Sequence, residues 1–330
     1  MVKLYVESVR QFAEKYAKHI DVTSVKNRLN ALLAIVNSSP AHEAYVKLLL
    51  REIDDDLLTA TPSQINVVCE KFSKLKATRN KRFGPTNEPF KRLIENALDY
   101  EAARGIYRSY VPAMGIKTCA YCNAQYAVSF TSRDGKDYAQ FEVDHWKSRE
   151  KYPFLSISFY NYVPSCPSCN KHKGKNDLAY CLYSEVPEVI GGSEYNPFVF
   201  AISDLSLSRF LNTFNTDLLK LEFKSNTGNV AIERDYARFA INEMYECFRD
   251  EAALSIRRFL FYSDAYREQM KQNYRSLFSD DCLYEEFIYG IPFNQEGVLH
   301  RPLAKMIQDI RSQLENSKVY YDWMKRKGLI

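Results

Sequence analysis

Long apolar runs are missing from this sequence of 330 residues, so none of its segments is expected to cross a bilayer. The first 20 residues mix Glu7, Glu14 and several lysines into an amphipathic helical pattern, without the apolar block of a signal peptide. The sequence also contains no internal repeat and no low-complexity tract. Apolar and aromatic residues are plentiful, so we expect a folded protein, and its length suits two or three domains. Because neither a signal peptide nor a membrane span is indicated, we expect it in the cytoplasm.

A strong charge of one sign is lacking as well. The formal net charge is +4, which is too small to identify a nucleic-acid-binding protein by itself. Its distribution says more, because residues 117–175 hold nine Lys or Arg against five Asp or Glu, while the rest of the chain is balanced. The positive excess therefore lies in one stretch, and it supports a contact with nucleic acid there.

Helical periodicity dominates both ends of the chain. Apolar residues repeat at steps of three and four, which predicts amphipathic helices, and hydroxyl residues before proline mark further helix starts. The expected helices cover 5–20, 25–36 after a Thr23 cap, two segments that start at Ser39-Pro40 and Thr61-Pro62, then 89–107, 236–274 and 303–314.

Alternation with a period of two predicts two β-hairpins. The first joins 126–130 to 138–143 and leads into Asp144-His145, and the second joins 219–223 to 230–232. The predicted class is α+β, a mostly helical chain around a small central module. We divide it into a helical region over 1–110, the central module over 111–197, and a mostly helical region with a small hairpin over 198–330.

The eight cysteines are more typical of metal ligands or core residues than of a disulfide framework. Cys119 and Cys122 form one C-x-x-C pair, and Cys166 and Cys169 form another. Two such pairs can supply the closed tetrahedral site that structural zinc prefers, and the alternative is paired buried cysteines without a metal. The remaining cysteines stand alone and are expected to be small buried hydrophobes: Cys69, Cys181, Cys247 and Cys282.

Polar residues of a distinctive order surround the cysteine pairs. Asp144-His145 lies between the pairs at an expected strand end, Asn161 follows, and the second pair continues into Asn170 and a basic segment. This order resembles the HNH endonucleases, also called His-Me finger or ββα-metal nucleases. The step of nine residues from Asn161 to Asn170 equals the separation of the middle and last signature residues in that superfamily. The resemblance covers about 117–177.

The longer string from Asp144 to Cys166 is similar to a subset of bacterial HNH proteins. Many of these belong to anti-phage systems, including nuclease subunits of the Septu type that work with an ATPase. The resemblance implies a zinc-stabilised ββα-metal module, DNA cleavage, an ATPase partner, and an Asn161 that orients the general base by hydrogen bonding. Gly174 stands where some members carry a further His, which favours a cation site of Asp144 and Asn170 alone.

The residue types suit hydrolysis of a phosphodiester bond. An ordinary imidazole, with a pKa near ~6.5, is largely neutral in the cell, so His145 can act as general base. The oxygens of Asp144 and Asn170 suit Mg²⁺ or Mn²⁺. Neighbouring residues on a strand face opposite sides, so the strand must end or twist to bring Asp144 and His145 to one site. The expected phosphate contacts are Lys147, Arg149, Lys151, Lys171, Lys173 and Lys175.

Two alternatives stay open. The substrate could be RNA, such as transfer RNA cut by a toxin, because phosphate chemistry does not itself exclude a 2′-hydroxyl. The chain could also be a zinc-stabilised nucleic-acid-binding module without catalysis, which would leave the set of Asp144, His145 and Asn170 unexplained. His172 lies two residues from Asn170, so on a helix it would point elsewhere, to phosphate or solvent.

Overall fold

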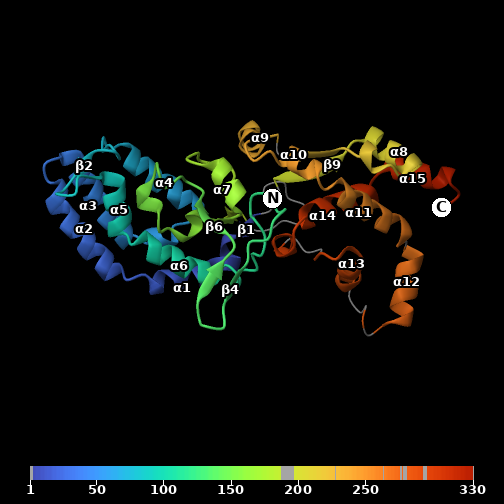
Figure 1. Cartoon of the computed structure of the whole chain (residues 1–330), viewed down its shortest axis with the longest axis horizontal. Helices are drawn as coiled ribbons and strands as arrows, with labels where there is room; N and C mark the ends of the chain where they lie inside the picture. The colour runs from blue at the N-terminus through green and yellow to red at the C-terminus, as the bar shows by residue number, and fades with distance from the viewer. Residues whose placement is uncertain are drawn as a thin grey trace. The chain divides into compact units, whose positions relative to one another are not determined.

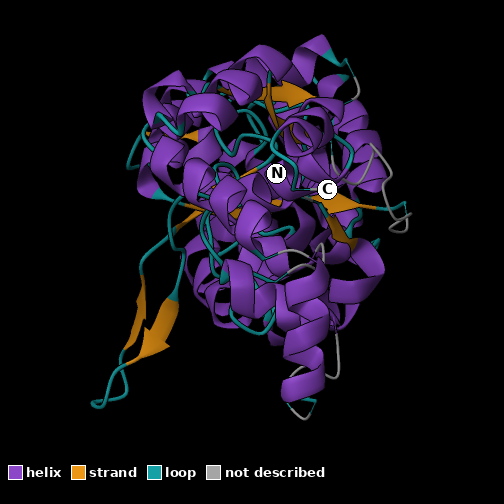
Figure 2. Ribbon diagram, turned by 90° about the vertical axis from the view of Figure 1, so that its right-hand side faces the viewer, coloured by secondary structure: helices purple, strands orange, loops and turns teal. Residues whose placement is uncertain are grey.

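The protein is mostly helical with small two-stranded sheets, which confirms the predicted α+β class (Figures 1 and 2). The computed structural model describes residues 3–186, 197–226, 228–262, 264–275, 277, 281–292 and 296–329. Within these residues, no helix combines the length and hydropathy needed to cross a membrane.

Two compact units make up the chain. Lys3–Ile116 and Ala127–Glu188 form one, which we name the N-terminal unit, and Met1–Val2, Lys117–Tyr126 and Val189–Ile330 form the other, the C-terminal unit. The sequence-based boundaries at 110 and 197 stay predictions.

The first helices of the N-terminal unit follow the predicted periodicity. They are α1 (Val6–His19), α2 (Val22–Val36), α3 (Pro40–Asp54) and α4 (Pro62–Ser73). The prediction that Thr23 caps the second helix was wrong. The Asp21 carboxylate caps α2 by accepting the Ser24 N–H at 2.9 Å, and α2 begins one residue before Thr23. At α4 the Gln64 side chain accepts the Thr61 N–H at 2.8 Å, as a capping box requires.

The single helix expected over 89–107 is two helices, α5 (Phe90–Ala97) and α6 (Tyr100–Tyr110). Asp99 between them adopts a left-handed conformation with φ 55°, which no helix can continue through. The break matters for the site, since α6 then carries Tyr100 and Arg104 to it.

The strands of the N-terminal unit are short. The predicted hairpin exists as β4 (Ser129–Thr131) and β5 (Asp137–Ala139), and it extends away from the body of its unit in both views (Figures 1 and 2). After it, β6 (Glu142–His145) pairs with β7 (Tyr162–Ser165), and α7 (Pro167–Lys173) follows. The other short elements are β1 (Leu4–Tyr5) parallel to β8 (Tyr183–Ser184), β2 (Arg82–Phe83) against β3 (Glu88–Pro89), η1 (Leu57–Thr59), η2 (Pro153–Leu155) and η3 (Phe159–Asn161).

Buried aromatic rings hold β7 in place. The Tyr107 ring of α6 lies 4.6 Å from that of Tyr162, and the Tyr16 ring of α1 lies 5.6 Å from that of Phe159. Each such pair contributes roughly 0.5–1.5 kcal/mol beyond the burial of its surface. The strand that faces His145 is therefore fixed by helices from the first 110 residues.

The C-terminal unit consists of helices around one two-stranded sheet. In that sheet β10 (Leu221–Ser225) pairs with β9 (Phe198–Ile202), so the predicted hairpin of 219–223 with 230–232 was wrong. Val230 instead begins α9, because the Asn229 side chain accepts the Ala231 N–H at 3.0 Å and caps a helix. The remaining elements are α8 (Asp204–Thr213), η4 (Thr216–Leu218), α9 (Val230–Ala237), α10 (Ile241–Glu246), α11 (Arg249–Phe261), α12 (Asp264–Asn273), α13 (Asp281–Tyr289), η5 (Glu296–His300), α14 (Ala304–Glu315) and α15 (Lys318–Arg326).

Asn123 joins distant parts of the C-terminal unit. Its residue is fully buried and left-handed, with φ 52°. The Nδ2 amide donates to the Val298 carbonyl at 2.7 Å and to the Thr118 hydroxyl at 3.0 Å, while Oδ1 accepts the Lys305 N–H at 3.0 Å. One carboxamide thus ties the segment 117–126 to η5 and to the start of α14.

Replacing Asn123 by Ala should lower the free energy of unfolding by about 2–4 kcal/mol, because it removes three buried hydrogen bonds, among them those to the Val298 carbonyl and from the Lys305 N–H. Urea denaturation measures the change. Asn316→Ala is the matched control, since the Asn316 amide donates to Ser312 at an exposed position, at 2.9 Å. Equal stability of the two variants would contradict this role of Asn123.

Candidate active site and zinc centre

The four cysteines of the two C-x-x-C pairs come together, as the sequence predicted. Cys119, Cys122, Cys166 and Cys169 are buried, and their Sγ atoms all lie within 4.8 Å of one another. In a tetrahedral zinc site with Zn–S bonds of about 2.3 Å, the sulfurs are separated by about 3.8 Å. The cluster could therefore hold a zinc ion after a small contraction.

Backbone N–H groups support the thiolate form of this cluster. The Cys122 Sγ accepts the Ala124 N–H at 3.4 Å, and the Cys166 Sγ accepts the Cys169 N–H at 3.4 Å. Hydrogen bonds to a sulfur favour its deprotonated form, which is the form that binds a metal. The donor set thus suits zinc chemically as well as spatially.

The solitary cysteines differ from one another. Cys181 is buried as expected, and Cys69 is partly buried. Cys247 is exposed, so the expectation of a buried hydrophobe was wrong there: it lies between α10 and α11 at the surface. The side chain of Cys282 lies outside the described residues.

A pocket of about 300 Å³ in the N-terminal unit contains the other predicted chemistry. Asp144, His145 and Asn170 all line it. β6 ends at His145, so the expected strand end is confirmed, and both neighbouring side chains reach the same pocket. The rest of its lining is mostly charged or polar: Tyr100, Arg104, Glu142, Ser148, Arg149, Glu150, Lys173 and Lys175.

The ring of His145 is held in one tautomer. Its Nε2 lies 3.2 Å from the Ser156 carbonyl oxygen, which can only accept a hydrogen bond. Nε2 therefore carries the proton, and the lone pair is on Nδ1. The rings of Tyr100 and Tyr162 flank the imidazole, with centroids 5.5 Å and 5.1 Å away.

Burial sets the charge state of His145. Its residue is 5 % exposed, and its surroundings lower the pKa of the imidazole from 6.5 to about 3, with desolvation as the largest cause. The nearby cations Arg149 and Lys173 also act to lower this pKa, and the hydrogen bond that Nε2 donates to the Ser156 carbonyl acts to raise it. An imidazole with an ordinary pKa is only largely neutral at physiological pH, whereas the lowered pKa of His145 makes its ring fully neutral there.

Asn161 acts on the backbone around His145. Its Nδ2 donates to the carbonyls of Lys147 and Leu155, both at 3.1 Å, and its Oδ1 accepts the Lys147 N–H at 2.7 Å. Leu155 directly precedes Ser156, whose carbonyl holds the His145 ring. The buried Asn161 thus positions the ring through the loop, and no hydrogen bond from its side chain to the imidazole is among the described contacts.

Asp177 fastens the same loop from the other side. Its Oδ1 accepts the Ser148 N–H at 3.0 Å, and its Oδ2 accepts the Tyr152 hydroxyl at 3.2 Å. Between β6 and β7 the chain is therefore tied at several points. The long connection is a fixed part of the site.

Lys173 is a buried member of the site. Its Nζ lies 3.2 Å from Asp144 Oδ1, with the Lys173 side chain 1 % exposed and the Asp144 side chain 8 % exposed. Lys173 follows Asn170 by three residues on α7, so both lie on one helix face. The sequence suggested a phosphate contact for Lys173, whereas the structure places its ammonium group inside the pocket beside the predicted cation ligand.

The other expected phosphate contacts divide into two groups. Arg149 and Lys175 line the pocket with Lys173. Lys147 does not, and its ammonium lies 4.4 Å from the centre of the Trp146 ring. The others outside the pocket lining are Lys171, which is exposed like His172, and Lys151, which forms an ion pair with Asp177 at 3.2 Å.

Sequence patterns did not point to two contributors from α6. Tyr100 packs against His145, and the Arg149 guanidinium lies 4.1 Å from the centre of the Tyr100 ring. Arg104 lines the pocket one helical turn further on. Both precede the first cysteine pair, where only the helix itself was predictable.

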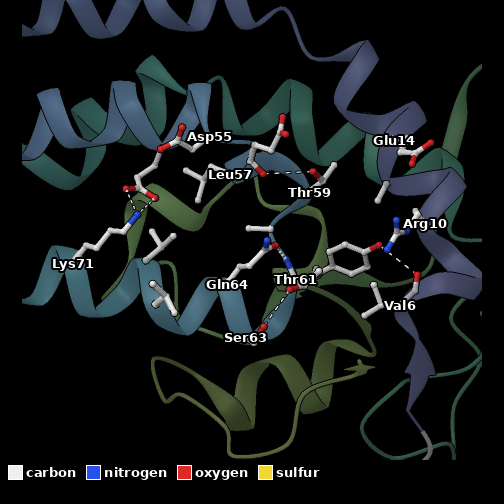
Figure 3. A pocket seen from close by; sticks show the side chains of 17 residues that line it. Val6, Arg10, Glu14, Asp55, Leu57, Thr59, Thr61, Ser63, Gln64 and Lys71 are labelled. Atoms are coloured by element: carbon white, nitrogen blue, oxygen red, sulfur yellow. Dashed lines mark hydrogen bonds and ion pairs between the residues drawn. The ribbon is translucent and has the colours of Figure 1, made fainter. Parts of the chain in front are cut away.

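A separate pocket of about 490 Å³ lies in the N-terminal unit between α1, η1 and α4 (Figure 3). Its lining includes Arg10, Glu14, Asp55 and Lys71, and Lys71 reaches the Glu52 carboxylate at 2.8 Å. None of the sequence-predicted catalytic residues lines it. The predicted residues Asp144, His145 and Asn170 line the smaller pocket instead.

Comparisons with models of known protein families, with curated proteins and with solved structures found no match to this chain. What the structure establishes is thus a cluster of four buried cysteines that could bind zinc, in a mostly helical protein with small sheets.

Replacing Cys166 by Ser should remove zinc binding and lower the thermal stability, since a structural zinc site contributes folding energy. Elemental analysis of the purified protein, together with thermal unfolding, measures both effects. Cys247→Ser is the matched control at an exposed cysteine. If the Cys166 variant retains wild-type zinc and stability, the zinc assignment is wrong.

The low pKa of His145 predicts that acid destabilises the protein through this residue. Between about pH 6.5 and 3 the unfolded chain binds a proton at residue 145 and the folded chain does not, so stability falls as the pH falls. From pH 7.5 to 5, the wild type should lose about 1–2 kcal/mol relative to His145→Gln, as measured by urea denaturation. Parallel pH profiles of the two proteins would mean that the ring titrates normally.

Proposed function

We propose that this protein is a metal-dependent endonuclease of the HNH type that hydrolyses phosphodiester bonds in DNA. One observation carries the proposal. A buried neutral imidazole, held at Nε2 by the Ser156 carbonyl, shares a pocket with Asp144, Asn170 and several cationic side chains. A positioned base, oxygen ligands and positive charge are the groups that phosphodiester hydrolysis requires.

The order of elements supports this class. Asp144 and His145 are the last residues of β6, and Asn161 is the last residue of the connection from β6 to β7. β7 then pairs antiparallel with β6, and α7 follows with Asn170. Strand, strand and helix in this order are the parts of the ββα-metal module that the sequence motif resembles. The cysteine cluster, with zinc bound, would brace the ends of this module.

His145 would take a proton from the attacking water at Nδ1, the nitrogen that keeps its lone pair. A base with a pKa near 3 is weak, but an anionic phosphate beside the ring favours the imidazolium form and raises that pKa. The Ser156 carbonyl, which accepts the Nε2 proton, stabilises the same imidazolium. Substrate binding would therefore bring His145 toward the pKa that general-base catalysis needs.

Asp144 and Asn170 would hold Mg²⁺ or Mn²⁺. Such an ion stabilises charge on the phosphate and on the leaving oxygen when it is bound. Both residues offer hard oxygen atoms to one pocket, which suits these ions. Lys173 adds a fixed positive charge beside Asp144, and Arg104, Arg149 and Lys175 can neutralise the substrate phosphates.

An ATPase partner and a role in anti-phage defence rest on the sequence resemblance alone. The helices outside the module would then bind the partner or hold the nuclease inactive. Copurification of an ATPase with the tagged chain would support this part of the proposal, and full unregulated activity of the isolated chain would count against it.

Replacing His145 by Ala should abolish nicking of supercoiled plasmid in the presence of Mg²⁺ or Mn²⁺, with zinc content and folding unchanged. His172→Ala is the matched control, because His172 is an exposed histidine of the same module. Gel analysis of relaxed and linear plasmid measures the activity. A His145 variant that cuts as fast as wild type would exclude this residue as the base.

The same assay separates the alternatives when total cellular RNA is digested in parallel. His145-dependent loss of RNA with intact plasmid would favour the RNA nuclease. Binding of DNA without cleavage, with the ATPase partner present as well as absent, would favour the non-catalytic zinc-stabilised module.

A further inference from the structure

The β4–β5 hairpin presents two aromatic rings to solvent. Phe130 and Tyr138 are register partners on the two strands and remain 50 % and 48 % exposed. Their rings are nearly parallel, with an interplanar angle of 17° and centroids 5.5 Å apart. A cross-strand pair that served only to stabilise the hairpin would not require this much exposed ring surface.

The two rings form one wall of a slot. A pocket of about 480 Å³ lies between them and the face of α6 that contains Gly105, Arg108 and Ser109. This volume falls within the range of roughly 300–1,000 Å³ that is typical of small-molecule sites. The slot therefore has room for a flat ring between an aromatic wall and a helix.

The helix side of the slot is open and carries an unsatisfied donor. A Cβ built on Gly105 would meet nothing within 4 Å, so the glycine leaves space where a side chain would project. Gly105 has no positive φ to require glycine, and glycine inside a helix is unfavourable. The Arg108 Nε is buried with no hydrogen-bond partner among the described residues, and Arg108 lines the slot.

Helix α6 also connects the slot to the pocket of His145. Arg104 lines that pocket, Gly105 lines the slot, and Arg108 follows Arg104 by one helical turn. Four residues of helix rise about 6 Å, and successive nucleotides of a stacked strand rise about 3.4 Å. Consider a nucleic-acid strand that has one phosphate beside Arg104. A nucleotide only a few positions along the strand from that phosphate would then lie at the slot.

We infer that the slot between the β4–β5 hairpin and α6 binds an unpaired base of the substrate strand, a few nucleotides from the phosphate that is cut. The base would stack on Phe130 and Tyr138, while the Arg108 side chain would donate a hydrogen bond to the base or its phosphate. Arg133 at the hairpin turn adds exposed positive charge. A paired base cannot enter such a slot, so substrates with single-stranded segments are preferred. The inference rests on the proposed function for its substrate strand.

Fluorescence tests the slot directly. The probe is a single-stranded DNA oligonucleotide with 2-aminopurine at one position, bound to the full-length protein without added divalent cations, and the same oligonucleotide in a perfect duplex is the comparison. The wild type should quench 2-aminopurine at saturation, since a stacked ring loses its emission, and it should bind the single strand more tightly than the duplex.

Two variants should weaken binding of the single strand by roughly 5- to 150-fold, the range that loss of one base–aromatic stack produces. Phe130→Leu keeps an apolar strand residue but removes the ring. Gly105→Leu projects a side chain into the slot from the helix side, where an added Cβ meets no atom within 4 Å. Leucine is also a better helix former than glycine, so the thermal stability should not fall. Phe261→Leu, at an aromatic that is 73 % exposed in α11, and Ala102→Leu, at an exposed position of α6, are the controls.

The slot is wrong if Phe130→Leu and Gly105→Leu bind the single strand like wild type, if 2-aminopurine stays bright in the saturated complex, or if the duplex binds equally well. These outcomes differ from failure of the nuclease proposal. If the wild type quenches 2-aminopurine, the two variants do not, and the protein never cuts DNA, the base-binding slot is supported and the nuclease proposal is wrong. If cutting depends on His145 and is unchanged in these two variants, the nuclease proposal is supported and the base-binding slot is wrong.

Discussion

The hydrogen bonds of one buried carboxamide, Asn161, determine the geometry of the candidate site. They join the backbone of Lys147, just after β6, to the backbone of Leu155, which precedes the carbonyl that holds His145. Without them, Leu155 would lose its tie to Lys147, although Asp177 would still hold Ser148 and Tyr152 of the same connection. With them, the imidazole has one tautomer and one direction. Preorganisation of this kind would let a short motif support the proposed catalysis on so little secondary structure.

Opposite charges are paired inside the pocket. Asp144 and Lys173 form a buried ion pair, and buried ions require a partner because the interior solvates charge poorly. Asp144 is also the predicted cation ligand, so Lys173 and a divalent cation would act on the same carboxylate. With Arg104 and Arg149 near it, the pocket suits a phosphate group better than an apolar ligand. The low pKa of His145 follows from the same dry and positive surroundings.

Motif spacing predicted what is local in sequence, and it could not predict what packing brings in. The cysteine pairs, the strand end at His145 and the pocket residues Asp144 and Asn170 were all expected from their order. Tyr100 and Arg104 were not, because a helix break at Asp99 and the packing of α6 decide their place. The wrong hairpin over 219–232 has a similar cause: β10 found a partner in β9, and Asn229 capped a helix instead of turning a strand.

The central claim is that the loop between β6 and β7 keeps His145 as a neutral base with its lone pair on Nδ1. Nitrogen-15 NMR of histidine-labelled protein, with the signals of residue 145 identified by the His145→Gln variant, tests it most directly. The account predicts a protonated Nε2 and an unprotonated Nδ1 from pH 8 down to pH 5. An imidazolium at neutral pH, or a proton on Nδ1, would contradict it.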